Sequence, residues 1–351
     1  MMSTPSAGNT LKICDKTILP GKRVTIDLPI SPLYTRTPMS IPVHVINGKK
    51  AGPVLLVCAA VHGDEINGVE TIRRLLKMRG VNHLRGTLIA VPVVNIFGFI
   101  YHSRYLPDRR DLNHTFPGSK TGSMAARISH IFVSEILNQC THGIDFHTGG
   151  MHRTYLPQLH ANLRHKETLQ LARAFGVPVL LDVRDQDNSL RDIANKNKIP
   201  FLVFEGGEAL RLDELSIRAG LKGILNVMRE LGMLKKSSPS FNSRAEPFIA
   251  RSSVWVRTNH SGLFLSPTAL GHRVLKNQVL ASIADPINGT ESIVYAPTKG
   301  IIIGCNHLPL VNEGEALFQI AKFEKSKKVL AQVKEFHTTH LEDETPTEWD
   351  V

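Results

Sequence analysis

Short apolar runs alternate with amphipathic stretches over much of the chain, from about Pro20 to Leu234. Stretches such as GVETIRRLLKMRG and MAARISHIFVSEILNQ repeat apolar residues at steps of three and four, which is typical of helices with one packed face. The runs between them are apolar throughout, as in strands that are buried on both faces. We therefore predict an α/β fold with a mostly parallel or mixed sheet flanked by helices. The predicted strands are VLLVCAA (54–60), TLIAVPVVN (87–95), GIDFH (143–147), PVLLD (178–182) and PFLVFE (200–205).

The pattern changes after residue 234. The helical stretch LSIRAGLKGILNVMRELGM ends at Gly232, and the polar segment KKSSPSFNSR follows it. Beyond this segment, short apolar runs such as SSVWVRT, SGLFLS and GIIIG recur with Gly, Pro and Asn between them, which predicts a small all-β barrel or sandwich. Exposed strand edges there could pair between subunits and make a homo-oligomer. The predicted organisation is an α/β domain (1–235), a small β-rich domain (236–335) and a polar tail (336–351).

Composition narrows the class of protein. Of the 351 residues, 42% are hydrophobic and 21% are charged, as in soluble globular proteins. No segment reaches the roughly 18 apolar residues of a membrane span, and the first residues lack the pattern of a signal peptide. The four cysteines show no paired spacing, which favours a reducing compartment. We therefore expect a cytoplasmic protein without a membrane partner.

The net charge of +11 raises the question of a nucleic-acid partner. The basic residues are dispersed, with few aromatic residues among them, which argues against a nucleic-acid surface. A positive field also draws small anionic molecules toward a cleft. We expect a small-molecule substrate and no nucleic acid.

Candidate metal ligands stand where predicted strands end. His62 and Glu65 follow the first strand, with Gly63 between them allowing a tight turn, and His147 ends another strand. The carboxyl ends of parallel strands meet at one edge of a sheet, so these side chains can face one point. Imidazole nitrogen and carboxylate oxygen suit Zn²⁺, which takes three protein ligands in catalytic sites and keeps a fourth position for water. Asp145 points to the same face of its strand as His147 and is placed to orient a ligand imidazole.

The His-x-x-Glu pair alone is weak support, because such pairs also occur on ordinary helix surfaces. The metal prediction depends on the third ligand at a strand end. Other histidines lack that setting and are predicted on the surface or in loops: His83, His102, His130, His142, His160 and His165.

Four motifs occur in a fixed order: VHGDEINGVE, VPVVNIFGFIYHSRYLPDRRDLNHTFPGS, DFHTGGMHRTYLPQ and LVFEGGEALRLDE. Together they resemble the succinylglutamate desuccinylase/aspartoacylase family of the zinc carboxypeptidase superfamily. The resemblance covers about residues 50 to 235, and the β-rich segment resembles the small domain often appended in this family. It implies a zinc-carboxypeptidase-like fold and metal-dependent hydrolysis of an amide bond.

The same resemblance implies residue roles. It places one Zn²⁺ per chain on His62, Glu65 and His147, and it makes Glu205, in the sequence FEGG, the general base and acid. A carboxylate near a zinc site can take a proton from water and pass it to the leaving amine. Glu208 is the alternative, but the strand-end position favours Glu205 because the sheet sets its direction.

An arginine before the Asp-Leu-Asn sequence stabilises the attacked carbonyl in relatives of this family. The stretch SRYLPDRRDLN offers Arg104 and Arg110 for this role, and Arg104 is the better match. Arg109 is predicted in solvent or paired with Asp108.

The chain departs from the family where the substrate carboxylate is bound. Relatives carry Asn-Arg after Asp-Leu, whereas this chain has Asn113 followed by His114. Histidine cannot form the bidentate fork of a guanidinium. Three explanations stay open: His114 binds a different polar group, Arg153 provides the missing charge, or the substrate is not an acyl amino acid.

Three functions follow from these residues. The first is a zinc-dependent amidohydrolase that removes an acyl group from an N-acyl amine or amino acid. The second is a carboxypeptidase-like hydrolase of a peptide or protein tail, which His114 disfavours. The third is a binding or regulatory protein without turnover, which the intact ligands and Glu205 disfavour.

Overall fold

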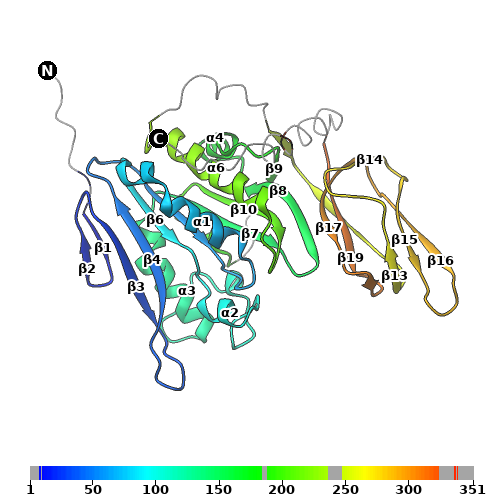
Figure 1. The fold of residues 1–351 in the computed structure, drawn as a ribbon, viewed down its shortest axis with the longest axis horizontal. Helices are drawn as coiled ribbons and strands as arrows, with labels where there is room; N and C mark the ends of the chain where they lie inside the picture. The colour runs from blue at the N-terminus through cyan, green and yellow to red at the C-terminus, as the bar shows by residue number, and fades with distance from the viewer. Residues whose placement is uncertain are drawn as a thin grey trace.

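A computed structural model describes residues 10–183, 188–235 and 247–323, together with residues 8, 336 and 338. A large mixed sheet crosses the molecule, with helices on both faces, and a β-rich segment extends from one end (Figure 1). This is the predicted α/β architecture with an additional small all-β part. No helix among the described residues is both long enough and apolar enough to cross a membrane.

Eleven of the strands precede residue 251. They are β1 (Leu11–Ile13), β2 (Lys16–Ile18), β3 (Arg23–Ile30), β4 (Met39–Asn47), β5 (Val54–Ala59), β6 (Thr87–Val91), β7 (His142–Gly149), β8 (Arg153–Ala161), β9 (Val179–Asp182), β10 (Phe201–Glu208) and β11 (Phe248–Ala250). The α-helices with described bounds are α1 (Asn67–Lys77), α2 (Ile96–Ile100), α3 (Met124–Glu135), α4 (Lys166–Phe175), α5 (Leu190–Lys196) and α6 (Glu214–Glu230). Three short 3₁₀ helices span Arg79–His83, Leu112–His114 and Leu137–Gln139.

The centre of the sheet is parallel. Strands β6, β5, β7 and β10 lie side by side in that order, all parallel, while β4 and β8 flank them in the antiparallel sense. The six residues of β5 and the eight of β7 are all buried, as expected for strands covered on both faces. Because the central strands are parallel, β5, β7 and β10 deliver their carboxyl ends to the same edge.

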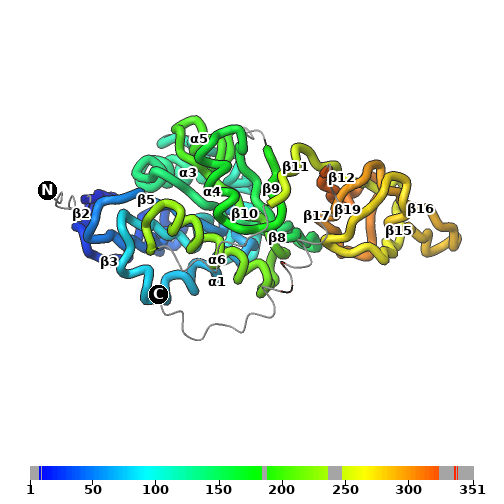
Figure 2. The backbone as a smooth tube through the Cα atoms, turned by 90° about the horizontal axis from the view of Figure 1, so that it is seen from above, coloured from blue at the N-terminus to red at the C-terminus, as the bar shows by residue number. Residues whose placement is uncertain are grey.

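Two apolar cores sandwich this sheet. Ile72 of α1, Phe175 of α4 and Ile224 of α6 pack on one face, whereas Phe132 of α3 and Ile193 of α5 belong to the core on the other face. Figure 2 shows α1 and α6 on the opposite side of the sheet from α3 and α5. The helices fix the strands from both sides, so the strand ends form a rigid platform.

The C-terminal strands divide between the large sheet and a second, smaller sheet. They are β12 (Ser253–Arg257), β13 (Gly262–Leu265), β14 (Arg273–Val274), β15 (Val279–Ala284), β16 (Glu291–Tyr295), β17 (Gly300–Asn306), β18 (Leu310–Val311) and β19 (Ala316–Ala321). Strand β17 pairs with β8, and β19 and β12 follow, while β16, β15, β13 and β18 form a separate four-stranded sheet. Their own core includes Phe264, Leu280 and Phe318.

Strand pairing therefore crosses the predicted domain boundary at β8–β17 and at β9–β11. The predicted linker KKSSPSFNSR lies outside the described residues except for Lys235, and so does the predicted tail except for Phe336 and Thr338. The division into domains, the oligomeric state and the cellular location stay predictions. All four cysteines are free thiols.

Two strand predictions need correction. The run at 87–95 leaves the sheet after Val91, because Pro92 has no N–H to donate to a neighbouring strand. Strand β8 was not among the predicted strands, and it holds Pro157 in its middle, which has no N–H for a neighbouring strand. On one side of β8, residues 153–155 pair with β17 and residues 158–161 pair with β9. Pro157 lies between these two pairings, so no ladder hydrogen bond is lost there.

Candidate metal centre and active site

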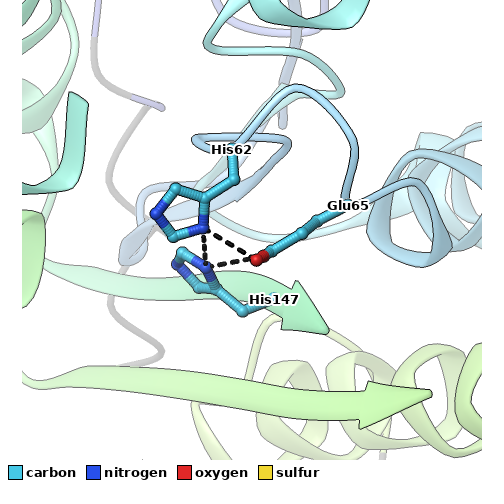
Figure 3. A group of neighbouring side chains, drawn as sticks. All are labelled: His62, Glu65 and His147. Carbon is cyan, nitrogen blue, oxygen red and sulfur yellow. Dashed lines mark hydrogen bonds and ion pairs between the residues drawn. The ribbon is translucent and has the colours of Figure 1, made fainter. Parts of the chain in front are cut away.

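The three predicted metal ligands converge at the carboxyl edge of the sheet. Strand β5 ends at Ala59, and Ala60 has a left-handed backbone (φ 49°), which turns the chain sharply toward His62 and Glu65. His147 comes from β7, the parallel neighbour of β5. The two imidazoles and the carboxylate face one point (Figure 3).

The distances within this group fit a shared cation. The Nδ1 atoms of His62 and His147 are 3.1 Å apart, and each lies 2.9 Å from an oxygen of Glu65. Ligand atoms of a tetrahedral zinc ion, with bonds near 2.0–2.1 Å, stand about 3.3 Å apart. All three side chains are buried, with at most 4% of each residue exposed.

The ring nitrogen of His62 and of His147 that points away from the shared point contacts a carboxylate. Nε2 of His147 lies 2.8 Å from Oδ2 of Asp145, and Nε2 of His62 lies 3.1 Å from Oδ1 of Asp111. An imidazole that donates its Nε2–H to a carboxylate presents the Nδ1 lone pair to the shared point. Carboxylates of this kind orient the histidine ligands of metal sites. The donor set and its supports therefore suit Zn²⁺, and the contact predicted for Asp145 is confirmed.

The charges inside the group are strongly coupled. Burial alone would raise the pKa of Glu65, but the adjacent imidazoles of His62 and His147 hold it well below its ordinary value. Burial would lower the pKa of His147, yet the carboxylates of Asp145 and Glu65 raise it well above its ordinary value. A buried anion between two imidazoles is what a divalent cation would stabilise further.

Gly63 is required by packing. A Cβ atom at this position would stand 2.0 Å from the carbonyl carbon of Gly98 and 2.2 Å from the nitrogen of Phe99. The loop that carries His62 and Glu65 thus lies directly against the backbone of α2. The sequence indicated a tight turn here, and the structure shows a close approach of two backbones as the reason for glycine.

Glu205 and Glu208 have different surroundings. Glu205 is the register partner of His147 in the parallel β10–β7 pair, lines the cavity beside the metal ligands, and has a buried Oε2 atom without a hydrogen-bond partner. Burial raises the pKa of Glu205 to about 7, with the Glu65 carboxylate adding to the rise and the two imidazoles opposing it. Glu208 instead accepts hydrogen bonds from the His152 N–H and the Thr154 hydroxyl, which hold the β7–β8 turn. The structure places Glu205, and not Glu208, against the ligand group.

The two candidate arginines, Arg104 and Arg110, also have different surroundings. The guanidinium of Arg104 lines the cavity, donates to Glu65 Oε1 at 3.2 Å and forms a two-nitrogen contact with Asp111. Arg110 is mostly exposed and lies 3.8 Å from Asp108. Of these two arginines, Arg104 is the one positioned to reach a group bound next to the candidate metal ligands.

A cavity of about 750 Å³ opens over these residues. Asn113, His114 and Arg153, the predicted substrate-binding residues, all line it. Asn113 is fixed by a hydrogen bond from the Leu190 N–H to its side-chain oxygen. The C-terminal β-rich segment supplies part of the wall through Asn306, Leu308 and Glu315. The cavity therefore lies between the α/β sheet and this segment.

Sequence reasoning missed several residues of the site. Asp111 received no role, although it stands in the quoted motif RRDLN and its contact with His62 needs the fold to be seen. His142 and His160 were predicted on the surface or in loops, which is wrong: His142 begins β7 and is buried, and His160 lies in β8 with its imidazole 4.0 Å from Glu205. Burial and the positive charge of Arg191 lower the pKa of His160 to about 3, so His160 is neutral. His160 and Arg191 both line the cavity.

Comparison with known proteins finds relatives along most of the chain. N-alpha-acetyl-L-2,4-diaminobutyric acid deacetylase from Halomonas elongata is 27% identical over 301 residues, which cover 82% of this chain and 86% of the relative. The product-bound structure of the ectoine utilization protein EutE (DoeB) from Ruegeria pomeroyi has a TM-score of 0.76 and 26% identity, covering 86% of this chain and 95% of that one. A succinylglutamate desuccinylase/aspartoacylase structure from Rhodobacter sphaeroides shares the fold, with a TM-score of 0.76 and 24% identity over 86% of this chain and 94% of that one. Residues 51–231 match the model of the succinylglutamate desuccinylase/aspartoacylase catalytic domain, and the chain therefore belongs to this family of deacylating hydrolases.

Proposed function

We propose that this protein is a zinc-dependent deacylase that hydrolyses the amide bond of a small N-acyl amine or N-acyl amino acid. The observation that carries the proposal is the group of His62, Glu65 and His147, whose ligand atoms all lie within 4.8 Å of one another. Glu205 borders the same cavity, so a metal site and a proton acceptor stand side by side.

Zn²⁺ held by these three residues would supply Lewis acidity, which polarises a carbonyl and makes a water molecule acidic near neutral pH. The proposed role of Glu205 is to take the proton of the attacking water and deliver it to the leaving nitrogen. Its unpartnered, buried Oε2 atom is available for this transfer. A carboxyl group with a pKa near the working pH can both accept and release a proton.

Arg104 is the proposed stabiliser of negative charge on the attacked carbonyl oxygen. Its guanidinium is held by Asp111 and reaches the Glu65 carboxylate, so it is fixed at the metal site before substrate arrives. A preorganised cation of this kind stabilises charge that develops in the transition state. Arg110, at the surface, is not used in this proposal.

The cavity favours a small substrate over a peptide tail. Asn306, Leu308 and Glu315 close part of the wall with the β-rich segment, where a peptide-binding cleft would stay open. Asn113 and Arg153 are proposed to bind polar groups of the substrate, with Arg153 supplying the guanidinium that is missing beside Asn113. His114 can exchange single hydrogen bonds but cannot form a carboxylate fork.

The relative from Halomonas elongata is named for deacetylation of Nα-acetyl-L-2,4-diaminobutyrate, so this compound heads the substrate panel. Purified protein loaded with zinc is incubated with N-acetyl and N-succinyl derivatives of amino acids and simple amines, and the released amine is measured. Dipeptides with a free C-terminal carboxylate are tested in the same way as carboxypeptidase-type substrates. We expect hydrolysis of at least one acyl compound, with zinc bound at one per chain and activity removed by a chelator and restored by zinc.

Two results would overturn the proposal. Hydrolysis of the dipeptides alone would favour the carboxypeptidase-like alternative. Binding of acyl compounds by the zinc-loaded protein without any turnover would favour a binding protein.

A further inference from the structure

Glu315 places an acidic side chain in the wall of the catalytic cavity. It precedes β19, in the turn after β18, and is partly buried. Its Oε2 atom accepts a hydrogen bond from the Asn312 N–H at 3.0 Å, and its Oε1 atom lies 3.4 Å from the side-chain nitrogen of Asn306. These contacts fix the carboxylate in place, and each oxygen keeps a second lone pair for a ligand.

Both contacts come from neutral groups. Within the described residues, no Lys, Arg or His nitrogen lies within 4.0 Å of the Glu315 carboxylate. A partly buried carboxylate without a cationic partner bears an unfavourable desolvation energy, which a positively charged ligand would offset. The Glu315 carboxylate therefore offers a negative charge that a cationic group of a ligand could pair with.

A guanidinium lines the same cavity as this carboxylate. Arg153 of β8 is the register partner of Asn306 in β17, and its guanidinium carbon sits 5.5 Å from the centre of the Trp255 ring. The Trp255 ring holds Arg153 by a cation–π contact, so positive and negative groups both stay available to a ligand at one wall of the cavity. An N-acyl amino acid that carries an additional amine has the matching charges: a carboxylate and an ammonium group.

We propose that Glu315 is a specificity-determining residue that binds an ammonium group of the substrate and selects N-acyl diamino compounds over N-acyl compounds with neutral side chains. This inference rests on the proposed deacylase function and names the substrate class for the same cavity. Glu315 takes no part in the chemistry of amide cleavage, so its removal acts on discrimination between substrates.

The test compares two substrates of nearly equal shape. Nα-acetyl-L-2,4-diaminobutyrate ends in an ammonium group, and Nα-acetyl-L-norvaline carries a methyl group at that position. The zinc-loaded wild type and the Glu315→Gln variant are assayed on both. The amide of glutamine keeps an oxygen for the Asn312 N–H, removes the charge, and replaces the Oε1 atom that faces Asn306 by an NH₂ group. Glu313→Gln is the matched control, because Glu313 is an exposed carboxylate two residues away that does not line the cavity.

For Glu315→Gln we expect kcat/KM on the diaminobutyrate compound to fall about 10- to 100-fold, the contribution of one hydrogen bond between charged groups. We expect kcat/KM on the norvaline compound to change less than about threefold, because that substrate has no charge for Glu315 to bind. Glu313→Gln should resemble the wild type on both compounds, and zinc content should be equal in all three proteins.

An equal loss on both substrates, or no loss on either, would overturn the role of Glu315 while leaving the deacylase proposal intact. A zinc-loaded wild type that hydrolyses neither these two compounds nor any other acyl compound would overturn the deacylase proposal itself. The two failures are therefore distinguishable in one experiment.

Discussion

Asp145 offers a quantitative test of the metal centre away from the ligands themselves. Its carboxylate lies 2.8 Å from Nε2 of His147, and the two side chains are only 2% and 4% exposed. Asp145→Asn keeps the size of the side chain and removes its charge. The imidazole then loses the anion that fixes its tautomer and raises its basicity, so its Nδ1 atom becomes a weaker ligand.

The expected loss is about 10- to 100-fold in zinc affinity, which corresponds to about 1.4–2.7 kcal/mol. Asp111→Asn gives an internal comparison on the second histidine. Its contact with His62 is longer, at 3.1 Å, its side chain is 14% exposed, and its charge is shared with Arg104. Solvent and the arginine both weaken the effect of the Asp111 charge on the imidazole, so we expect a loss below about tenfold for this variant.

The assay is competition for zinc between each protein and a chromophoric chelator, at one pH. Thermal unfolding of the zinc-free proteins shows whether either substitution disturbs the fold without metal. Wild-type zinc affinity in Asp145→Asn would refute the reasoning, because a buried carboxylate at hydrogen-bond distance would then have no influence on the ligand. A larger loss in Asp111→Asn than in Asp145→Asn would refute the ranking by burial and distance.

Three further predictions concern the loop and the cavity. Glu205→Gln should keep the zinc content and lower kcat by about 10²–10⁴-fold, because the proton acceptor is lost. Turnover and metal content are measured on the same protein, and loss of zinc would instead make Glu205 a ligand. His114→Arg should increase kcat/KM on N-acetyl-L-aspartate if the missing guanidinium fork limits such substrates, and no gain would show that another group binds the carboxylate. Gly63→Ala should lower the free energy of unfolding by about 1–3 kcal/mol in urea titrations, because its Cβ meets the Gly98 backbone. Gly150→Ala is the control, with no atom within 4 Å of its added Cβ, and equal stability of the two variants would contradict the packing argument.

Local patterns in the sequence were sufficient for much of the fold. The apolar runs that became β5, β7, β9 and β10 and the amphipathic stretches that became α1, α3 and α6 need only a burial periodicity to be recognised. The candidate metal ligands could be named from the sequence because they follow or end such strands, and parallel strands meet at one edge. The resemblance in four motifs gave the family, which the comparisons confirm.

Contacts between distant segments were not predictable in this way. Strand β8 forms despite Pro157 because its neighbours change at that residue, and this requires β9, β10 and β17 to be in place. His160 enters the cavity only as a member of that strand. The distinction between Arg104 and Arg110, six residues apart, came from which guanidinium faces Glu65 and Asp111.

The sequence by itself indicated the α/β architecture and the candidate metal ligands, because each depends on a residue type at a fixed place relative to a strand. The resemblance to the family indicated the candidate acid–base residue. Only the tertiary structure decided that Asp111 supports His62 and that Glu315 reaches the catalytic cavity. Asp111 is 49 residues from His62, and Glu315 belongs to a segment more than 100 residues beyond Glu205. Hydrogen bonds and desolvation act over a few ångströms in space, so their partners are fixed by the folded chain and leave no regular spacing in the sequence.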